Sequence, residues 1–419
     1  MPQPSADRLV LLYRVSQAFN SSLDLDEVLR RVMDEVVSAT RAERGFLMLP
    51  DADGRLVFRA ARGMDQQTIE SPEFQISRGV VERVAREGQA CLTSNAQDDA
   101  WLSTRESVMV LGLRSILCVP LKLKGATLGI IYVDNRLQAG LFTPDDLELL
   151  TAIASSAAIA IENARLYQVA VEKGRMEREL QVAREVQAGL IPRETPRIAG
   201  WDFAAWWQPA RQVAGDFYDF IPITLAKVSE PSPGLGIVIA DVSDKGMPAA
   251  LFMALTRSIV RASVSSAQTP AQCIAQANRL VCADAANGMF VTLFYAQLDP
   301  LSGEVVYVNA GHNPPLLYSA GQDKLVELRR TGMALGVDEA CTFEGRAVQL
   351  NSGDFLLFYT DGVTEAPDMQ GQEFGLERLR QVIFDHRRAS AAELMAALNQ
   401  AVSDLAPFDD ITVVVARLL

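Results

Sequence analysis

Cysteine and histidine are scarce in this sequence. The chain of 419 residues holds five cysteines and two histidines. No two cysteines form a Cys-x-x-Cys pair and their number is odd, so neither a disulfide framework nor a zinc knuckle is predicted, and a reducing compartment is expected. The two histidines, His312 and His386, are too few to build a multi-histidine metal centre.

Basic clusters and long apolar runs are missing as well. The net charge is −13 and no basic cluster is longer than a pair such as Arg387–Arg388, so nucleic-acid binding is not expected. A membrane span needs about 20 apolar residues, whereas the nearest candidate, residues 152–161, is short and rich in Ala and Ser. Residues 1–7 lack the basic and apolar regions of a signal peptide. A cytoplasmic protein without membrane contact is therefore expected.

The first third of the chain alternates helical and strand patterns. Apolar residues recur on one helical face over residues 25–37, and Asp24 is a plausible N-cap. A turn at residues 51–54 separates two strand patterns, and later segments add a short helix, two further strands and a long helix that begins near Pro144 with Thr143 as its cap. This order predicts an α+β domain with a mainly antiparallel sheet. The predicted strands and short helix cover residues 45–49, 56–60, 79–86, 115–123 and 127–133.

The stretch from Gly129, GIIYVDNRLQAGLFTPDDLELLTAIASSAAIAIENARLY, resembles the C-terminal third of a GAF domain. The resemblance covers residues 9–167 and implies a sensor domain over residues 1–163. GAF domains that bind cyclic nucleotides carry an Asn-Lys…Phe…Asp-Glu signature, but this chain has Arg136 and Asp146 in place of its Lys and Glu. A cyclic nucleotide is therefore not expected. Two alternatives stay open: an unknown small-molecule ligand, or an empty domain used for dimerisation.

Residues 164–196 are predicted to form a helical, coiled-coil-like linker. Two heptad seams follow one another out of phase, and Gly174 lies where they meet. One hypothesis is that the two helical halves change register when the sensor changes state; the alternative is a plain turn between two unrelated helices. A homodimer through this linker is predicted, against intramolecular packing of the helix on the sheet. The seams are Leu150, Ile153, Ala157, Ala160, Ala164, Tyr167 and Val171, then Met176, Leu180, Ala183, Gln187 and Leu190.

After Pro192 and Pro196 the pattern changes to strand runs separated by pairs of helices. Such an order predicts a layered sandwich with sheets inside and helices outside, over residues 197–419. Residues 225–235 are predicted to be a surface loop. The predicted strands are residues 201–207, 236–242, 290–298, 305–309, 355–360 and 412–416, and the predicted helices are 248–265, 270–286, 376–387 and 391–405.

Acidic residues stand at the ends of several of these strands. Because strand ends of a sheet lie together, such carboxylates can converge, and converging carboxylates repel one another unless a cation neutralises them. Oxygen ligands without a His or Cys cluster favour Mg²⁺ or Mn²⁺ over zinc. Any single Asp is also explained as a turn or cap residue, and for Asp361-Gly362 taken alone that explanation is favoured. The four sites are Asp216 and Asp219, Asp241, Asp361, and Asp409 and Asp410.

Five blocks in this half, GDFYD, ADVSDKGMPAAL, NAGHNPPLL, LLFYTDGVTEA and DDITVV, resemble the RsbU/SpoIIE branch of the PPM metal-dependent protein phosphatases. The resemblance covers residues 180–419 and implies an α/β/β/α sandwich with two Mn²⁺ or Mg²⁺ ions that activate a water molecule. It implies that Asp241 bridges the two ions and that the Val242 carbonyl is a ligand. Asp361 and Asp409 complete one site, and Asp216 binds directly or through water. Asp410 and Asp219 are weaker candidates.

Other positions are less settled by the resemblance. Arg211, five residues before Asp216, corresponds in related enzymes to an Arg that grips the phosphate, although the alternative is a solvated strand-end residue. Ser243 stands where animal members have a His, so the proton donor is a metal-bound water or His312; the other reading is that His312 orders its turn. Asp244 stands where this branch often has Gly.

The resemblance as a whole implies a serine/threonine protein phosphatase under the control of a GAF sensor. Its substrate would be a small phosphorylated regulatory protein of the anti-sigma-factor-antagonist type. The alternative is a catalytically inactive PPM-fold binding module, but an Asp is retained at every expected ligand position. A sensor histidine kinase is excluded because the linker has no histidine and no Gly-rich ATP lid is visible.

Overall fold

A computed structural model describes residues 6–70, 76–97, 111–225, 231–266, 269–285, 288–403, 405 and 409–419. The chain divides into two compact units, residues 1–176 and 177–419. The division falls inside the predicted linker, and the domain limits at 163/164 and 196/197 remain predictions. The elements of the first unit are α1 (Ala6–Phe19), α2 (Leu25–Thr40), β1 (Arg44–Pro50), β2 (Leu56–Gly63), α3 (Arg78–Glu87), β3 (Cys91–Thr93), β4 (Ser115–Leu123) and β5 (Ala126–Asn135), and α5 (Pro144–Leu190) continues into the second.

The first unit is one antiparallel sheet with helices on both faces. Its strand order is β2-β1-β5-β4-β3. The central strand β5 is buried on both sides: Ile131 and Val133 pack with α1, α2 and α5, whereas Ile130 and Tyr132 pack with α3. Asp24 caps α2 by accepting a hydrogen bond from the Glu27 amide at 2.8 Å. The predicted α+β sensor fold is confirmed.

Helix α5 is continuous over 47 residues and passes through Gly174 without a break. The alternative of a plain turn between two helices is therefore wrong. Leu150, Ile153, Ala157, Ala160 and Ala164 of the first seam are buried in the core of the first unit, as the intramolecular alternative required. The seam spacing could not distinguish a core-facing helix from a coiled coil, because both repeat apolar residues every three or four positions.

The length and composition of α5 would also suit a membrane-spanning helix, the only one found among the described residues. Of its most apolar window, 44% is buried within the protein. The buried part includes Ile153, Ala157 and Ile161, which belong to the core of the first unit.

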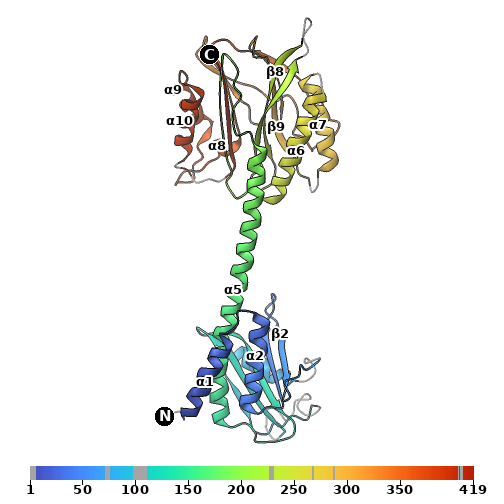
Figure 1. Ribbon diagram of the computed structural model, residues 1–419, viewed down its shortest axis with the longest axis vertical. Coiled ribbons are helices and arrows are strands. Elements are labelled where there is room, and N and C mark those ends of the chain that lie inside the picture. The colour runs from blue at the N-terminus through green and yellow to red at the C-terminus, as the bar shows by residue number, and fades with distance from the viewer. Residues whose placement is uncertain are drawn as a thin grey trace. The chain divides into compact units, whose positions relative to one another are not determined.

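The second unit is a four-layered sandwich of two five-stranded sheets between pairs of helices (Figure 1). Strand β14 shows the layering, because Leu356 and Phe358 face the other sheet while Leu357 and Tyr359 face α9 and α10. The sheets have the orders β13-β10-β9-β8-β7 and β12-β11-β14-β15-β6. The predicted α/β/β/α architecture is confirmed. Its elements are β6 (Trp201–Gln208), β7 (Phe217–Leu225), β8 (Ser232–Val242), α6 (Met247–Ser266), α7 (Pro270–Asp284), β9 (Val291–Leu298), β10 (Glu304–Ala310), β11 (Leu316–Ser319), β12 (Lys324–Glu327), β13 (Arg346–Gln349), β14 (Phe355–Tyr359), α8 (Asp361–Thr364), α9 (Gly375–Asp385), α10 (Ala391–Ser403) and β15 (Ile411–Leu418).

One predicted loop is partly strand. Residues 232–235 pair with β7 in a ladder that runs to the Leu225–Ser232 pair, so the expectation of a surface loop over 225–235 is wrong for those residues. Pro233 and Gly234 had suggested a loop, but an edge hairpin tolerates both residues. The short strands β11, β12 and β13 were not predicted, since four residues are too few to show a period.

Candidate active site at the acidic strand ends

The acidic residues lie at adjoining strand ends of the two sheets. Asp216 precedes β7 and Asp241 stands near the end of β8, and these ends adjoin because Phe217 pairs with Ala240. Asp361 follows β14 and Asp410 precedes β15, whose ends adjoin in the other sheet. Thr412 of β15 connects the sheets, since its Oγ1 donates a hydrogen bond to Asp216 Oδ2 at 3.0 Å.

The charges of these groups act on one another. Burial, followed by the charges of Asp361, Asp409 and Asp410, raises the pKa of Asp241 to about 7, although a hydrogen bond with Asp216 lowers it. Asp216 is 2% exposed, and burial followed by the Asp241 charge raises its pKa well above the usual range. Burial and the Asp409 charge raise the pKa of Asp361. The cluster therefore carries more negative charge than its surroundings stabilise.

Asp409 has a cationic partner in Lys245, which follows β8. Lys245 Nζ lies 2.7 Å from Asp409 Oδ2, and the two side chains are 40% and 26% exposed. The Lys245 charge also lowers the pKa of Asp361. The ammonium group thus offsets part of the negative charge on the open side of the cluster.

Asp410 holds the loop that leads to Asp216. Its Oδ1 accepts from the Ala210 amide at 2.8 Å and its Oδ2 from the Gly215 amide at 2.7 Å. Both carboxylate oxygens of Asp410 therefore hold this loop in place. A Cβ atom at Gly362 would overlap the backbone oxygen of Asp410, so only glycine allows this close approach.

Two further candidates are placed differently. Asp219 is 1% exposed, and its carboxylate lies against α6, 2.6 Å from Arg261 Nε and 3.1 Å from Arg257 Nε. It anchors a helix, and we leave it out of the site. Arg211 is exposed, and no described residue forms an ion pair with it. The Val242 carbonyl oxygen lies close to Gly215: a Cβ atom added to Gly215 would lie 3.2 Å from this oxygen.

Comparison with known proteins places the chain. A family model for Stage II sporulation protein E (SpoIIE) matches residues 231–419, and a GAF domain model matches residues 22–162. The phosphoserine phosphatase RsbU of Bacillus subtilis (strain 168) is 30% identical over 244 residues, which are 57% of this chain and 70% of RsbU. The chain belongs to the RsbU/SpoIIE family of PPM phosphatases. This confirms the predicted family and enzyme class.

Other relatives cover different shares of the phosphatase chain. Protein IcfG of Synechocystis sp. is 31% identical over 267 residues, and the match spans 56% of this chain but only 41% of IcfG. The solved SiaA-PP2C domain of Pseudomonas aeruginosa aligns with a TM-score of 0.50 over 59% of this chain and 98% of that domain, at 21% identity. The last likeness supports the fold of the second unit.

The interior of the phosphatase sandwich holds His312 as a neutral group. His312 is 1% exposed, its Nδ1 lies 2.8 Å from Thr292 Oγ1, and its amide donates to Asn309 Oδ1 at 2.9 Å. Burial lowers its pKa to about 3. Burial favours the neutral form of this histidine, and its hydrogen bonds to Thr292 and Asn309 support the turn-ordering role over that of proton donor.

The segment between Asp241 and α6 of the phosphatase contains one unusual backbone conformation. Asp244 has φ +83°, a region that glycine adopts at little cost and that other residues rarely adopt. Its carboxylate accepts from the next amide at 2.8 Å and is exposed. Ser243 exchanges backbone and side-chain hydrogen bonds with Phe290. Neither Ser243 nor Asp244 is therefore assigned as the proton donor for the leaving group.

The donor set of the phosphatase suits hard divalent cations. Among the described residues, no three carboxyl, imidazole or thiol groups stand ready to enclose a metal ion, and Lys245 takes up one carboxylate. The cluster nevertheless offers only oxygen donors, buried and with raised pKa values, a charge surplus that Mg²⁺ or Mn²⁺ would offset. The ligand assignment to Asp216, Asp241, Val242, Asp361 and Asp409 therefore remains a prediction.

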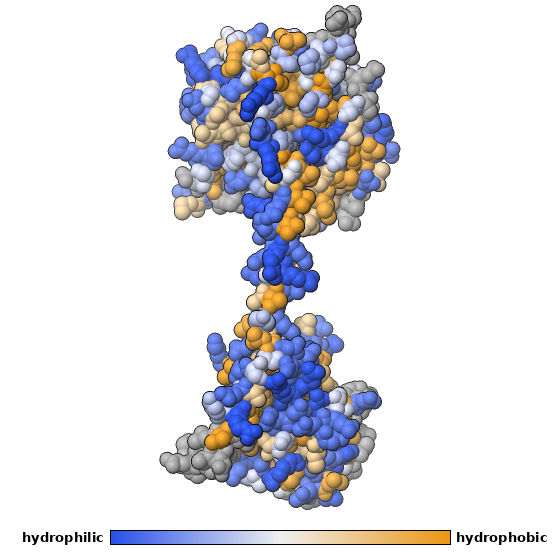
Figure 2. Space-filling view, in the orientation of Figure 1, coloured by the Kyte–Doolittle hydropathy of each residue, from blue (hydrophilic) through white to orange (hydrophobic). Residues whose placement is uncertain are grey.

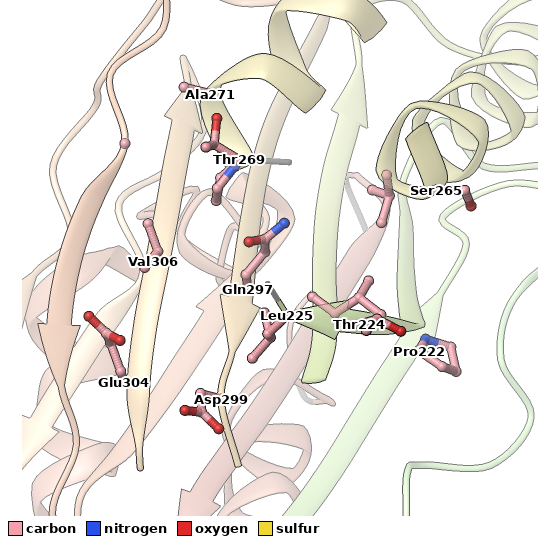
Figure 3. A pocket seen from close by; sticks show the side chains of 14 residues that line it. Pro222, Thr224, Leu225, Ser265, Thr269, Ala271, Gln297, Asp299, Glu304 and Val306 are labelled. Atoms are coloured by element: carbon pink, nitrogen blue, oxygen red, sulfur yellow. The ribbon is translucent and has the colours of Figure 1, made fainter. Parts of the chain in front are cut away.

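A cavity of about 810 Å³ in the phosphatase unit is separate from this cluster. It lies at the opposite end of the strands, where Leu225 ends β7, Gln297 lies near the end of β9 and Asp299 follows β9 (Figure 3). Glu304 and Thr269 line it as well. None of the acidic residues of the cluster belongs to its wall.

Lys245 is expected to weaken the binding of a divalent cation at the acidic cluster. Because its ammonium competes with a divalent cation for Asp409, replacing Lys245 with Ala is expected to tighten Mn²⁺ binding several-fold, by about 1 kcal/mol. Calorimetric titration with Mn²⁺ at low salt measures this. Lys324→Ala, at an exposed lysine of β12, is the control and should leave the affinity unchanged. Weaker Mn²⁺ binding by Lys245→Ala would contradict this role.

Proposed function

We propose that this phosphatase removes the phosphoryl group from phosphoserine or phosphothreonine of a regulatory protein, with Mn²⁺ or Mg²⁺ bound at the acidic cluster. The observation that carries the proposal is the meeting of carboxylates from both sheets, connected by the Thr412–Asp216 hydrogen bond and by mutual effects on their pKa values. Two relatives, RsbU and RsbP of Bacillus subtilis, are named phosphoserine phosphatases. A small protein of the anti-sigma-factor-antagonist type is the substrate class that this relationship favours.

The residues that would hold two cations are Asp241, Asp361 and Asp409 with the Val242 carbonyl, while Asp216 binds directly or through water. When bound, such cations lower the pKa of a coordinated water and offset the charge on phosphoryl oxygens. Thr412 fixes the orientation of Asp216, and Asp410 fixes the preceding loop at Ala210 and Gly215. The chain thereby holds the carboxylates in place before the substrate arrives.

Hydrolysis of a phosphoserine peptide by the full chain tests this function. We expect turnover with Mn²⁺ or Mg²⁺ and none above background with EDTA. Equal turnover with and without EDTA would contradict the metal requirement. Binding of a phosphoprotein without turnover under any metal would favour the inactive binding module instead.

We also propose that the chain forms a homodimer through α5. Exposed apolar residues Ile159, Leu166, Val169 and Met176 share one heptad frame, which Leu180 and Ala183 continue. Figure 2 shows hydrophobic groups on the exposed stretch of this helix. Light scattering of Leu166→Asp is expected to give half the wild-type mass, whereas Val182→Asp, exposed but outside the frame, should not. A monomeric wild type would overturn the proposal.

For the GAF domain we propose a small apolar ligand. A cavity of about 770 Å³ lies between β2 and α3, lined by Met48, Leu56, Phe58, Val81 and Ala85 among others. The rest of that sheet face is filled by side chains such as Tyr132. The dye ANS should bind the wild type and lose affinity in Val81→Trp; undiminished binding would argue against this cavity.

We also propose a cytoplasmic location for the whole chain. Recovery of the chain in the membrane fraction after cell fractionation would contradict this location.

A further inference from the structure

Gln187 is a buried polar residue in the last turn of α5. It is 4% exposed, whereas its neighbour Val186 is 62% exposed. Its Nε2 donates to the carbonyl oxygens of Ala214 at 2.9 Å and Ala250 at 3.3 Å, and its Oε1 accepts from the Ala214 amide at 3.0 Å. One side-chain amide thus satisfies both backbone groups of Ala214.

The segments that Gln187 contacts are those that lead to the acidic cluster. Ala214 lies two residues before Asp216, in the loop 209–216 that Asp410 holds from its other side. Ala250 lies in the first turn of α6, shortly after the end of β8 that carries Asp241. Trp207 Nε1 donates to the Asp216 carbonyl at 3.0 Å, so the loop has a fixed position between three anchors.

We propose that Gln187 is a positioning residue through which α5 sets the place of Asp216 at the acidic cluster. The proposal rests on the proposed metal-dependent function and names the contact by which the helix acts on it. Leaving the buried amide or the Ala214 groups unpaired is costly, so the helix and the loop keep their contact when either moves. A one-residue shift in helical register turns the side chain by about 100° and breaks all three bonds.

The same contact could instead serve only to pack the end of the helix, and the two roles predict different results. A packing contact would lower the unfolding temperature without changing metal affinity in the folded protein. A positioning contact would weaken Mn²⁺ binding in a folded variant, because Asp216 would no longer be held beside Asp241. Either role frees the Ala214 amide, but only a positioning contact would also loosen the loop at the Gly215 amide, which donates to Asp410 and not to Gln187.

The experiment compares Gln187→Met, Gln187→Glu and the control Gln181→Met in the full chain. Met keeps the volume without hydrogen bonds, Glu keeps only the acceptor for Ala214, and Gln181 is exposed with its amide bonded to Glu185 alone. Mn²⁺ affinity is measured calorimetrically without substrate, and amide exchange is followed for the peptide that covers residues 209–216. We expect Gln187→Met to bind Mn²⁺ about tenfold more weakly, the equivalent of about 1.4 kcal/mol, with faster exchange at Ala214 and Gly215.

Gln187→Glu should lie between Gln187→Met and the wild type, and Gln181→Met should match the wild type. Wild-type Mn²⁺ affinity and exchange in a folded Gln187→Met would overturn the proposal. If Gln187→Met does not fold, the Mn²⁺ affinity of Gln187→Glu is measured in its place. An affinity below that of the wild type supports the proposal, and an affinity equal to that of the wild type would overturn it. A wild type that binds Mn²⁺ but hydrolyses no phosphopeptide would refute the proposed substrate and leave the affinity and exchange readouts of this inference intact.

Discussion

Asp241→Asn is expected to reduce phosphopeptide hydrolysis by at least about 10³-fold while the protein stays folded. Loss of one carboxylate from the cluster removes several kcal/mol of charge stabilisation by the cations it would hold. Assays at saturating Mn²⁺ with a phosphoserine peptide measure the loss. Asp244→Asn is the matched control, because this nearby exposed carboxylate accepts only from the next amide, and its activity should stay within about twofold of the wild type.

The same variant should show an opposite effect on stability without metal. The raised pKa of Asp241, about 7 against the usual 3.8, means that the folded chain binds its proton more tightly than the unfolded chain. Stability from this group is complete at acid pH and is lost as the pH rises from about 4 through 7. At pH 8 in EDTA, Asp241→Asn should therefore melt above the wild type, and Mn²⁺ should no longer raise its melting temperature. A lower melting temperature in EDTA would contradict the charge surplus.

Asp219→Asn is expected to destabilise the phosphatase unit by about 3 kcal/mol. The Arg257 side chain is 12% exposed, so removal of the Asp219 charge leaves a largely buried guanidinium without its partner, although Arg261, 44% exposed, can turn to water. Because two units unfold, the relevant transition in a thermal scan of the full chain is the one that Mn²⁺ shifts.

The control for Asp219 is Glu327→Gln. Glu327 pairs with Arg380 at 2.6 Å, but the two side chains are 37% and 36% exposed, and such pairs are worth less than about 1 kcal/mol. Below its melting temperature, Asp219→Asn should keep the wild-type Mn²⁺ affinity. A loss of metal affinity with unchanged stability would return Asp219 to the candidate ligands.

The sequence predicted best those features that depend on strands and their ends. Apolar runs closed by Asp241 and Asp361 placed two carboxylates at adjoining edges, because strand order brings such ends together. The heptad spacing of α5 was ambiguous, since Ile153 and Ala157 fit a coiled coil and a domain core equally well. Asp219 was ambiguous too, because a GDFYD block shows neither which face a carboxylate takes nor which arginines α6 brings to it.

Contacts between distant segments could not be read from the sequence. The Lys245–Asp409 ion pair joins two such segments, and a lysine in a polar loop gives no signal of its partner. Gln187 gave a misleading signal, since it occupied a seam position and suggested an interface between helices. Its actual partners, Ala214 and Ala250, are backbone groups, which leave no trace in residue identity.

The burial of Gln187 moves the start of the catalytic module upstream. A truncated protein that begins at residue 197, after the prolines, would lack the side chain that pairs with Ala214. One that begins near Glu177 would retain it. Fusions to another sensor domain should therefore be joined before the final turns of α5, and expression fragments should begin there, because these turns pack with the phosphatase unit.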